Sequence, residues 1–596
     1  MKLNNVIITC LLAGFLFIGQ PNPQTGPAEI SIPSSIEQHP KLDSALSLMV
    51  SHADQAYPES EDQVQITLEF SAPVDSNEPI LNIVNKVGGQ VQTYAGSQVQ
   101  ALVPVSELPD LAALPSITNI HIPNRPYPDA VSEGVVAINA DYYRLNHGTD
   151  GTGVKIAILD QGFAGYPALQ AVGELPAVVT AQSFRADGEV DGITPHGTAC
   201  AEIIYDIAPG AAYYFVTYDT DTEFVDAVDY LEAEGIHIVS HSLSFFNLGP
   251  YDGTSAVSAR ITLARDNGIF WVNSAGDYSH RHWEGMYYGD DTNIHHVWDG
   301  NSATVNSIGL LENGEYIEVY LSWNDWPTSN NNYDLFLMFD DGDGWDWIKY
   351  SSTVQSGIEP PVEMITYTAA PDIEYGYLIY NDQGAAEPCY LELFSPTHDL
   401  SFYTSSSSIP HTGDAVGAFS VGAVSVTDYA ASGLRAYSSQ GPTNSTGGGA
   451  PDYVNGSRIK PDIAAPDGVS TETESLFQGT SASAPHAAGA AALYASGYLA
   501  SFGVLPNPDQ IQEYLEYCAD KTFDWGTDID GEKNNEFGAG GLFMCEIPTV
   551  IELQRFSTNN LISPSVSIIL AILVTSFAGV SLSLISNRIK RTLDHR

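Results

Sequence analysis

The sequence predicts an α/β protein: a parallel sheet covered by helices on both faces, with a small α+β unit before it and an antiparallel β-sandwich inserted into it. The first observation is that apolar, strand-like runs alternate with helical stretches from residue 150 onward. Such alternation is typical of parallel sheets, whose strands are buried on both faces. The other two observations are short strand patterns, mixed with helical pieces between residues 30 and 125 and without helices between residues 281 and 405.

Composition excludes one class of partner. The 596 residues include 21 Lys and Arg against 73 Asp and Glu, which gives a formal net charge of −52. A phosphate backbone would be repelled by such a molecule, so we expect no nucleic acid partner. Because 43 % of residues are hydrophobic and only 16 % are charged, the acidic balance belongs to a globular chain rather than to a disordered acidic tail.

The two ends of the chain predict export and membrane anchoring. Lys2 precedes an apolar run with the length and flanks of a signal peptide, which we place at residues 1–20. Residues 564–586 are uncharged and long enough to cross a bilayer as a helix, and a basic tail follows at 587–596. The positive-inside bias makes that tail cytoplasmic. We therefore expect a single-pass cell-membrane protein whose residues up to the linker at 549–563 lie outside the cell.

The α+β unit at residues 28–127 shows no chemistry of its own, because it contains no cluster of nucleophile, base and metal ligand. Its predicted strands are VQITLEF (64–70), QVQALVPV (98–105) and ITNIHIP (117–123), with helices near 77–87 and 106–113. The predicted strands of the parallel sheet are VKIAILD, AYYFVTY, IHIVSHSL and IFWVNSAG. Ligands of parallel sheets bind at the carboxyl ends of the strands, so that edge is the expected site.

Three segments place reactive side chains at this edge. Asp160 ends the strand VKIAILD, and His196 begins the helix in TPHGTACAEII, with a glycine next to it that lets another backbone approach. Ser481 begins a helix built almost wholly from Ala and Gly in QGTSASAPHAAG, which leaves its hydroxyl at the positive end of the helix. Each segment alone has an ordinary structural interpretation. The three segments together are stronger evidence for a catalytic site than any one of them alone.

In the order Asp, His, Ser, these segments resemble the subtilisin-like serine protease family, or subtilases, over roughly residues 128–278 and 405–545. The resemblance implies that Ser481 attacks the scissile carbonyl, that His196 takes its proton, and that Asp160 orients the imidazole. A hydroxyl needs such a base because it is a poor nucleophile near neutrality. The implied catalytic domain occupies residues 128–280 and 406–548. It requires no cofactor, and its partners are polypeptide substrates.

The segment SHSLSFF resembles the family's substrate-binding strand, with Ser242, Leu243 and Ser244 at the positions that pair with substrate. Ser244 and Phe245 replace small glycines there, which predicts a narrowed subsite.

The segment VNSAGDYS departs from the family, which has asparagine where this chain has Asp277. An ionised carboxylate cannot donate a hydrogen bond to the oxyanion. Either Asp277 is kept protonated, which predicts an acid-side optimum, or the oxyanion depends on the Ser481 amide and catalysis is slower.

The resemblance also implies that residues 28–127 are an inhibitory prodomain, cut off near residues 126–135. A retained accessory domain is the alternative.

The insert at residues 281–405 resembles the jelly-roll modules of secreted proteases. Structural calcium is a weaker prediction, at Asp528 and Asp530 in TDIDGEKNN or in the DDGDG turn that begins at Asp340, where a solvated hairpin tip is the alternative.

Cysteine usage allows a disulfide outside the cell. Cys10 lies in the predicted leader, which leaves Cys200, Cys389, Cys518 and Cys545 and three possible sets of pairs. Cys518 and Cys545 flank one acidic loop and are the favoured pair.

Two other functions remain open from the sequence. A catalytically inactive relative would bind peptides or surface polymer through the same cleft. An acid peptidase of the sedolisin type would use Glu202 rather than His196 as its base. These alternatives differ in whether Ser481 is activated and in which side chain activates it.

Overall fold

The computed structural model describes residues 40–43, 46–47, 50, 63–72, 74, 79–123, 127–128, 134–290, 294–381, 388–427, 429, 433–521 and 533–546. The predicted signal peptide, linker, membrane helix and cytoplasmic tail lie outside these residues, as do Asp528 and Asp530. Within the described residues, no helix has both the length and the apolar character that crossing a membrane requires.

Within the described residues, the predicted α+β unit forms a four-stranded antiparallel sheet that packs with the helices α2 and α3. The strand order is β2-β3-β1-β4, and alternate residues such as Ile66 and Leu68 of the first strand are fully buried against the helices. The sequence did not predict β2, whose polar residues show no apolar alternation. The elements are β1 (Gln63–Phe70), α2 (Pro79–Lys86), β2 (Gln90–Ala95), β3 (Gln98–Pro104), the short 3-10 helix η1 (Val105–Glu107), α3 (Leu108–Ala112) and β4 (Ile117–His121).

The main sheet has seven strands, all parallel, in the order β21-β20-β11-β9-β6-β8-β7. Its interior strand β6 alternates strictly: Ile156 and Ile158 face one layer of helices, while Ala157 and Leu159 face the other. The fold class predicted from the sequence is therefore confirmed. The strands are β6 (Lys155–Asp160), β7 (Thr180–Ser183), β8 (Ala212–Thr217), β9 (Ile238–His241), β11 (Phe270–Ser274), β20 (Ala418–Ser425) and β21 (Ile463–Asp467).

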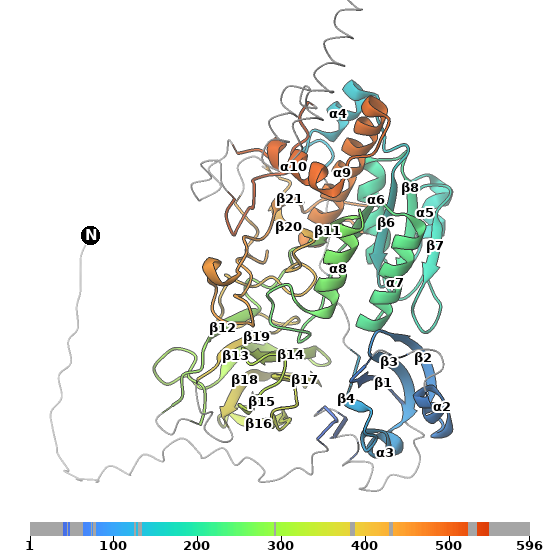
Figure 1. The fold of residues 1–596 in the computed structure, drawn as a ribbon. Helices are drawn as coiled ribbons and strands as arrows, with labels where there is room; N and C mark the ends of the chain where they lie inside the picture. The colour runs from blue at the N-terminus through green and yellow to red at the C-terminus, as the bar shows by residue number, and fades with distance from the viewer. Residues whose placement is uncertain are drawn as a thin grey trace, which may run out of the picture. The chain divides into compact units, whose positions relative to one another are not determined.

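Two pairs of helices cover the two faces of this sheet (Figure 1). One face carries α6 (His196–Ile207) and α9 (Thr480–Phe502), and the other carries α7 (Asp221–Glu234) and α8 (Ala256–Asp266). Every residue of α9 from Thr480 to Gly497 is buried, which explains why this helix contains almost only small side chains. The remaining helices are α4 (Ala140–His147), α5 (Tyr166–Val172), α10 (Pro508–Cys518) and the 3-10 helix η2 (Tyr453–Asn455). A disulfide joins Cys518 to Cys545, as predicted.

The insert is a sandwich of two four-stranded antiparallel sheets, ordered β12-β19-β14-β17 and β13-β18-β15-β16. Large side chains such as Trp323, Tyr333 and Tyr377 fill the space between the sheets. Five of the strands correspond to short strand patterns in the sequence, IEVYLSWND, YDLFLMFDD, MITYTAA, YGYLIYND and CYLELFS, whereas β12, β13 and β16 were not predicted. The strands are β12 (His282–Met286), β13 (Asn306–Leu311), β14 (Tyr316–Trp323), β15 (Tyr333–Asp340), β16 (Asp346–Ser351), β17 (Val362–Thr368), β18 (Ile373–Asn381) and β19 (Tyr390–Phe394).

Aromatic side chains join the sandwich to the α/β unit. Tyr320 and Phe394 of the first sandwich sheet contact Phe246, with ring centroids 5.0 Å apart in both pairs. Tyr278, which follows the end of β11, packs edge-on against the same Phe246 ring. The insert therefore rests on the loops that follow the carboxyl ends of the central strands.

Candidate active site

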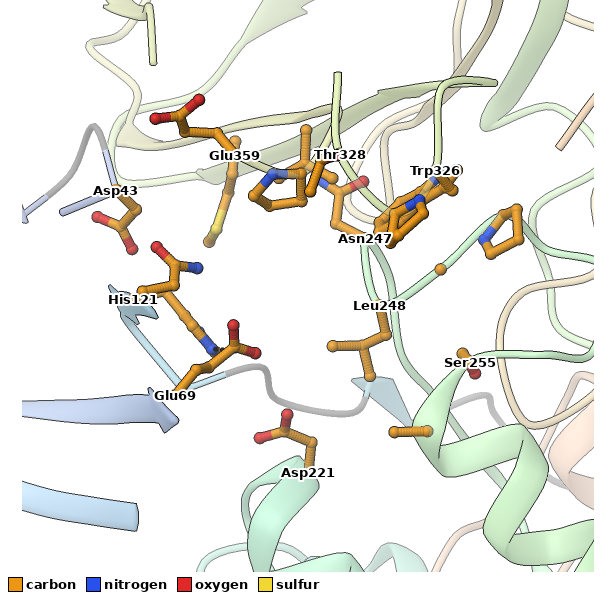
Figure 2. A pocket seen from close by; sticks show the side chains of 18 of the residues that line it. Asp43, Glu69, His121, Asp221, Asn247, Leu248, Ser255, Trp326, Thr328 and Glu359 are labelled. Atoms are coloured by element: carbon orange, nitrogen blue, oxygen red, sulfur yellow. Dashed lines mark ion pairs between the residues drawn. The ribbon is translucent and has the colours of Figure 1, made fainter. Parts of the chain in front are cut away.

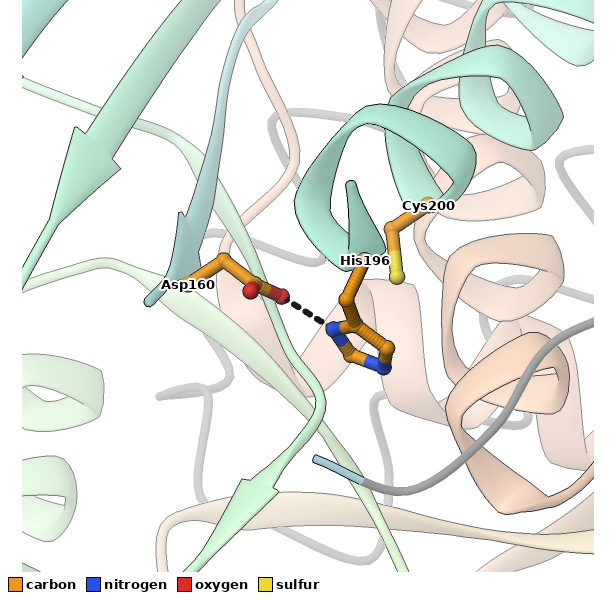
Figure 3. Close-up of side chains that lie close together, drawn as sticks. All are labelled: Asp160, His196 and Cys200. Atoms are coloured by element: carbon orange, nitrogen blue, oxygen red, sulfur yellow. Dashed lines mark hydrogen bonds and ion pairs between the residues drawn. The ribbon is translucent and has the colours of Figure 1, made fainter. Parts of the chain in front are cut away.

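The carboxylate of Asp160 stands at the carboxyl end of the interior strand β6 and is almost completely buried. Its Oδ2 lies 2.7 Å from Nδ1 of His196 (Figure 3). Its Oδ1 accepts the backbone N–H of Gln161 at 2.8 Å. With both oxygens engaged, the carboxylate holds the imidazole by one nitrogen and leaves Nε2 as the nitrogen available for proton transfer.

The beginning of α6 explains how His196 reaches this carboxylate. Gly197 donates its backbone N–H to the carbonyl of Gly162 at 3.1 Å. A Cβ at position 197 would come within 2.7 Å of that carbonyl and within 2.8 Å of the Asp160 Cβ. Only glycine fits there, as the sequence predicted, and its absence of a side chain allows helix and strand to approach closely.

Ser481 is the second residue of α9, and its side chain is fully buried. Its Oγ donates to the carbonyl of Ser242 at 3.1 Å, and Ser242 Oγ donates to the Ser481 carbonyl at 3.2 Å. This reciprocal pair joins the predicted nucleophile to the predicted substrate-binding segment. In this structure the hydroxyl proton is therefore directed at a backbone carbonyl.

Cys200 connects the two helices that carry His196 and Ser481. One ligand atom each from Asp160, His196 and Cys200 lies within 4.8 Å of the others, and the Cys200 thiol lies 3.8 Å from the Ser481 carbonyl. Burial, together with the Asp160 charge, raises the pKa of this thiol well above its usual value. It therefore stays protonated and is a poor nucleophile.

The same three residues form the one group of three or more His, Cys, Asp or Glu ligands that the described part of the chain brings close enough to hold a metal. The direct hydrogen bond between Asp160 and His196 accounts for their arrangement without a metal. The predicted alternative at Asp340 has another explanation, because its Oδ1 accepts the N–H groups of Gly342 and Gly344 at 2.7 and 3.1 Å. This is an exposed hairpin turn.

Asp277 follows β11 and faces the beginning of α9. Its Oδ1 accepts the backbone N–H of Thr480 at 3.0 Å. The side chain of Thr480 in turn accepts the N–H of Gly276 at 3.0 Å. The residue in the family's oxyanion position thus uses one oxygen as an acceptor and fixes the residue before Ser481.

A second carboxylate at this turn was not predicted. Asp467, the fully buried last residue of β21, accepts hydrogen bonds from the Gly479 N–H and from the side chains of Arg435 and Tyr437, the last at 2.6 Å. Gly479 has φ of 124°, a conformation that favours glycine. The signal was present in the sequence, since Asp467 ends a buried strand just as Asp160 does.

The substrate-binding segment already pairs with another strand. Leu243–Ser244 forms β10, which pairs antiparallel with β5 (Tyr127–Pro128), with Leu243 opposite Pro128 and Ser244 opposite Tyr127. The sequence predicted this role for residues 242–244 by resemblance. The structure shows that an extended chain pairs with the segment, and that this chain is residues 127–128 at the end of the α+β unit.

Glu202, the base expected for a sedolisin-type peptidase, does not contact Asp160. Glu202 is buried in the middle of α6, and its two oxygens accept the N–H groups of Glu472 and Thr473 at 2.9 and 3.3 Å. Burial raises its pKa. Its hydrogen bonds hold the loop before α9, whereas His196 makes the contact with Asp160. His486 is also structural: it is fully buried, and burial lowers its pKa to about 4.

The arrangement suits acyl transfer. A buried carboxylate holds an imidazole, and a serine hydroxyl at a helix N-terminus lies beside a strand edge that binds extended chain. These are the components with which a hydroxyl can be activated and a peptide carbonyl positioned.

Comparison with known proteins agrees with this chemistry. Residues 151–540 match the family described as the subtilase family. The structure is similar to the CspB protease of Clostridium perfringens, at 16 % identity and a TM-score of 0.47, over 69 % of this chain and 97 % of that one. It is similar to the epidermin leader peptide processing serine protease of Staphylococcus aureus, at 13 % identity and a TM-score of 0.41, over 81 % of this chain and 98 % of that one. The search of curated proteins found no match. Because the family match covers most of its length, the chain belongs to the subtilase family.

Proposed function

We propose that this subtilase is a membrane-anchored serine endopeptidase, made as a zymogen, in which Ser481, His196 and Asp160 are the catalytic triad. The observation that carries the proposal is the 2.7 Å hydrogen bond between buried Asp160 and His196 at the carboxyl end of β6. This bond sets the tautomer of the imidazole so that Nε2 can take the Ser481 proton. The carbonyl of Ser242 gives up that hydrogen bond when the hydroxyl turns toward the base.

The reaction then follows from these positions. Ser481 Oγ attacks the scissile carbonyl as its proton passes to His196, and the carboxylate of Asp160 stabilises the imidazolium. His196 returns the proton to the leaving amine, which departs and leaves an acyl-enzyme. A water activated by the same imidazole hydrolyses the ester and regenerates the hydroxyl.

We propose that Asp277 completes the oxyanion site through Oδ2 when it carries a proton. Thr480 already donates to Oδ1, so the other oxygen is the one that would donate to the oxyanion. His196 must be neutral to act as base while Asp277 must be protonated, and this restricts activity to a narrow window on the acid side.

We propose that the α+β unit inhibits the enzyme by placing its following residues in the cleft. The support is the β5–β10 pairing, in which residues 127–128 occupy the strand position expected for substrate. An antiparallel chain that continued past Pro128 would approach Ser242, which bonds to Ser481. We therefore expect self-cleavage among the first peptide bonds after Pro128, read by N-terminal sequencing of the mature enzyme. A first cut before Tyr127 would contradict this register.

The location of the enzyme rests on sequence alone. The signal peptide at residues 1–20 and the apolar segment at 564–586 support an anchored protein with its catalytic part outside the cell. Bound calcium at Asp528 and Asp530 is likewise proposed from the acidic loop alone. Removing calcium with a chelator should then lower the melting temperature of the parent but not that of a variant lacking both acids.

Labelling with a serine-directed fluorophosphonate tests the central proposal. The parent should label and cleave a denatured protein substrate, and Ser481→Ala should do neither. Ser483→Ala is the matched control, because Ser483 lies on the same helix and is also buried, but donates to the carbonyl of Ala465. A parent that binds peptides without labelling at any pH would be an inactive relative, which overturns the proposal.

A further inference from the structure

We infer that Glu202 is a positioning residue for the proposed reaction. It fixes the hairpin formed by residues 469–477, and this hairpin holds the ring of Phe477 against the imidazole of His196. The inference rests on the proposed peptidase function, because it concerns the general base of that reaction. It gives a role to a buried acid that lies outside the proposed triad.

The hairpin lies between β21 and α9. Val469 and Phe477 form an antiparallel pair, and the N–H of Phe477 donates to the Val469 carbonyl at 2.8 Å. Near the tip, the N–H of Thr471 donates to the Glu474 carbonyl at 2.8 Å, and the Thr471 hydroxyl accepts the Glu474 N–H at 2.9 Å. Val469 and Phe477 are both buried. The hairpin is therefore a defined unit with a buried base and a tip that closes on itself.

One buried side chain holds the tip of this hairpin. The two carboxyl oxygens of Glu202, in the middle of α6, accept the backbone N–H groups of Glu472 and Thr473 at 2.9 and 3.3 Å. Because Glu202 is almost fully buried, removing its two acceptors would take away the partner that fixes these N–H groups. The position of the tip therefore depends on this carboxyl group.

The base of the hairpin contacts the imidazole. The ring of Phe477 lies 6.0 Å from the ring of His196, centroid to centroid, at a tilt of 54°, which is within the range in which aromatic rings attract each other. Asp160 holds Nδ1 of the same imidazole (Figure 3), but a single hydrogen bond lets the ring turn about that contact. Phe477 restricts this rotation, because it occupies space beside the ring.

One helix carries both the residue that is positioned and the residue that fixes the hairpin. His196 begins α6, and Glu202 lies six residues further along it. A shift of the hairpin relative to α6 would therefore move Phe477 relative to the imidazole. The turn before Ser481 is fixed separately, by Asp467. Loss of the Glu202 contacts should therefore affect the imidazole more than the nucleophile.

Kinetics of single variants with a peptide substrate test the inference. Glu202→Met keeps the length of the side chain and removes both acceptors, so we expect kcat to fall about tenfold while KM changes less than about twofold. Phe477→Ala removes the ring and should cause a similar loss of kcat. Glu202→Gln keeps one acceptor and should cause a smaller loss; it replaces the methionine variant if that variant does not fold. An unchanged kcat in the Glu202 variants would overturn the inference.

The double variant shows whether Glu202 acts through Phe477. If the hairpin transmits the effect, adding Glu202→Met to the Phe477→Ala enzyme should lower kcat by less than about twofold further. Two losses that multiply to about a hundredfold would be independent of each other, and they would overturn the inference. A parent enzyme that cleaves no peptide would instead count against the proposed function.

Glu359→Met is the matched control. Glu359 is also a buried glutamate whose carboxyl group accepts N–H groups of a loop, those of Ser356 and Ile358 at 2.7 and 3.4 Å. It belongs to the sandwich and lines a cavity of about 800 Å³ together with Asp221 of α7. Figure 2 shows these two acids approaching the open space from opposite sides. The control should lower the melting temperature and leave kcat unchanged. A loss of kcat equal to that of Glu202→Met would overturn the inference.

Discussion

Buried carboxylates in two regions of the molecule have opposite surroundings. At the carboxyl ends of the parallel strands, Asp160 and Asp467 accept hydrogen bonds from backbone N–H groups and from side-chain donors. In the sandwich, Glu284 and Glu392 lie directly opposite each other on neighbouring antiparallel strands, β12 and β19. Burial raises the pKa of Glu284 to about 7 and the pKa of Glu392 to about 8.

The difference shows how each architecture determines the hydrogen-bond partners of a buried carboxyl group. The end of a parallel strand meets helix N-termini and turns, which offer N–H groups that stabilise a carboxylate. A cross-strand position offers a side chain of the neighbouring strand, here a second carboxyl group. The strand ends are therefore suited to fixing reactive groups, and the sandwich acids are suited to responding to pH.

The largest expected effect is on the triad. Asp160→Asn leaves one acceptor oxygen for two donors, the Gln161 N–H and His196 Nδ1, so an NH₂ group faces one of them and the imidazole loses its orientation and tautomer. We expect kcat to fall about 10⁴-fold with the fold retained. Steady-state kinetics with a peptide substrate measures this loss. A decrease in kcat of less than tenfold would show that Asp160 is not a member of the catalytic triad.

The second effect concerns Asp467, which we treat as a positioning residue. All its partners are donors, so Asp467→Asn turns an NH₂ group toward at least one of them and loosens the turn before Ser481. We expect kcat to fall by roughly 10 to 100-fold with little change in KM.

Asp462→Asn provides the matched control for that variant. Asp462 is also buried and precedes the same strand, but it bonds to Lys460, Lys533 and the N–H of Ser420. It should lower stability and leave kcat unchanged. If Asp467→Asn and Asp462→Asn lowered kcat equally, the effect of Asp467 on kcat would be a general structural effect and not one of positioning Ser481.

The third effect is a change of pH profile at Asp277. An asparagine donates at any pH, so Asp277→Asn should extend activity toward alkaline pH, with kcat above the parent's by about tenfold at pH 8. The comparison is a pH series of kcat for both enzymes. Superimposable profiles would exclude Asp277 as a donor to the oxyanion.

The smallest effect is on stability through the paired glutamates. Glu392 has a folded pKa of about 8 against an ordinary value of 4.5, so the folded state binds more protons between these pH values. Its stabilising contribution is full below pH 4.5 and is lost as pH rises through 8. His282 on β12, and His411 and Asp414 of the α/β unit, also face this group.

Glu392→Gln resembles the protonated acid at every pH. We expect the melting temperature to decline less between pH 5 and pH 8 in this variant than in the parent, by about 3 °C or more. Glu312→Gln, an exposed change on the same sandwich, should follow the parent. A parent whose melting temperature rises over this range would contradict the sign of the prediction.

Much of the fold could be predicted because its signals are local. VKIAILD is apolar throughout and marks a strand buried on both faces, and the Ala and Gly of residues 480–497 mark a helix with no room for side chains. Strands with polar faces, such as β2 and β12, escaped prediction because their partners, not their own residues, keep them extended. The roles of Asp160, His196 and Ser481 were predicted from resemblance, and the structure shows the hydrogen bond between the first two.

The amino-acid sequence by itself determined the parallel sheet and the favoured disulfide, and it predicted which residues are reactive. Only the tertiary structure decided what Asp467 does, that Glu284 faces Glu392, and that acids from a helix and an inserted sandwich line one cavity. The reason is physical: helix and strand patterns depend on neighbours a few residues away, whereas these contacts join residues far apart in the chain. Register and packing alone decide which of the many acids in this chain meet.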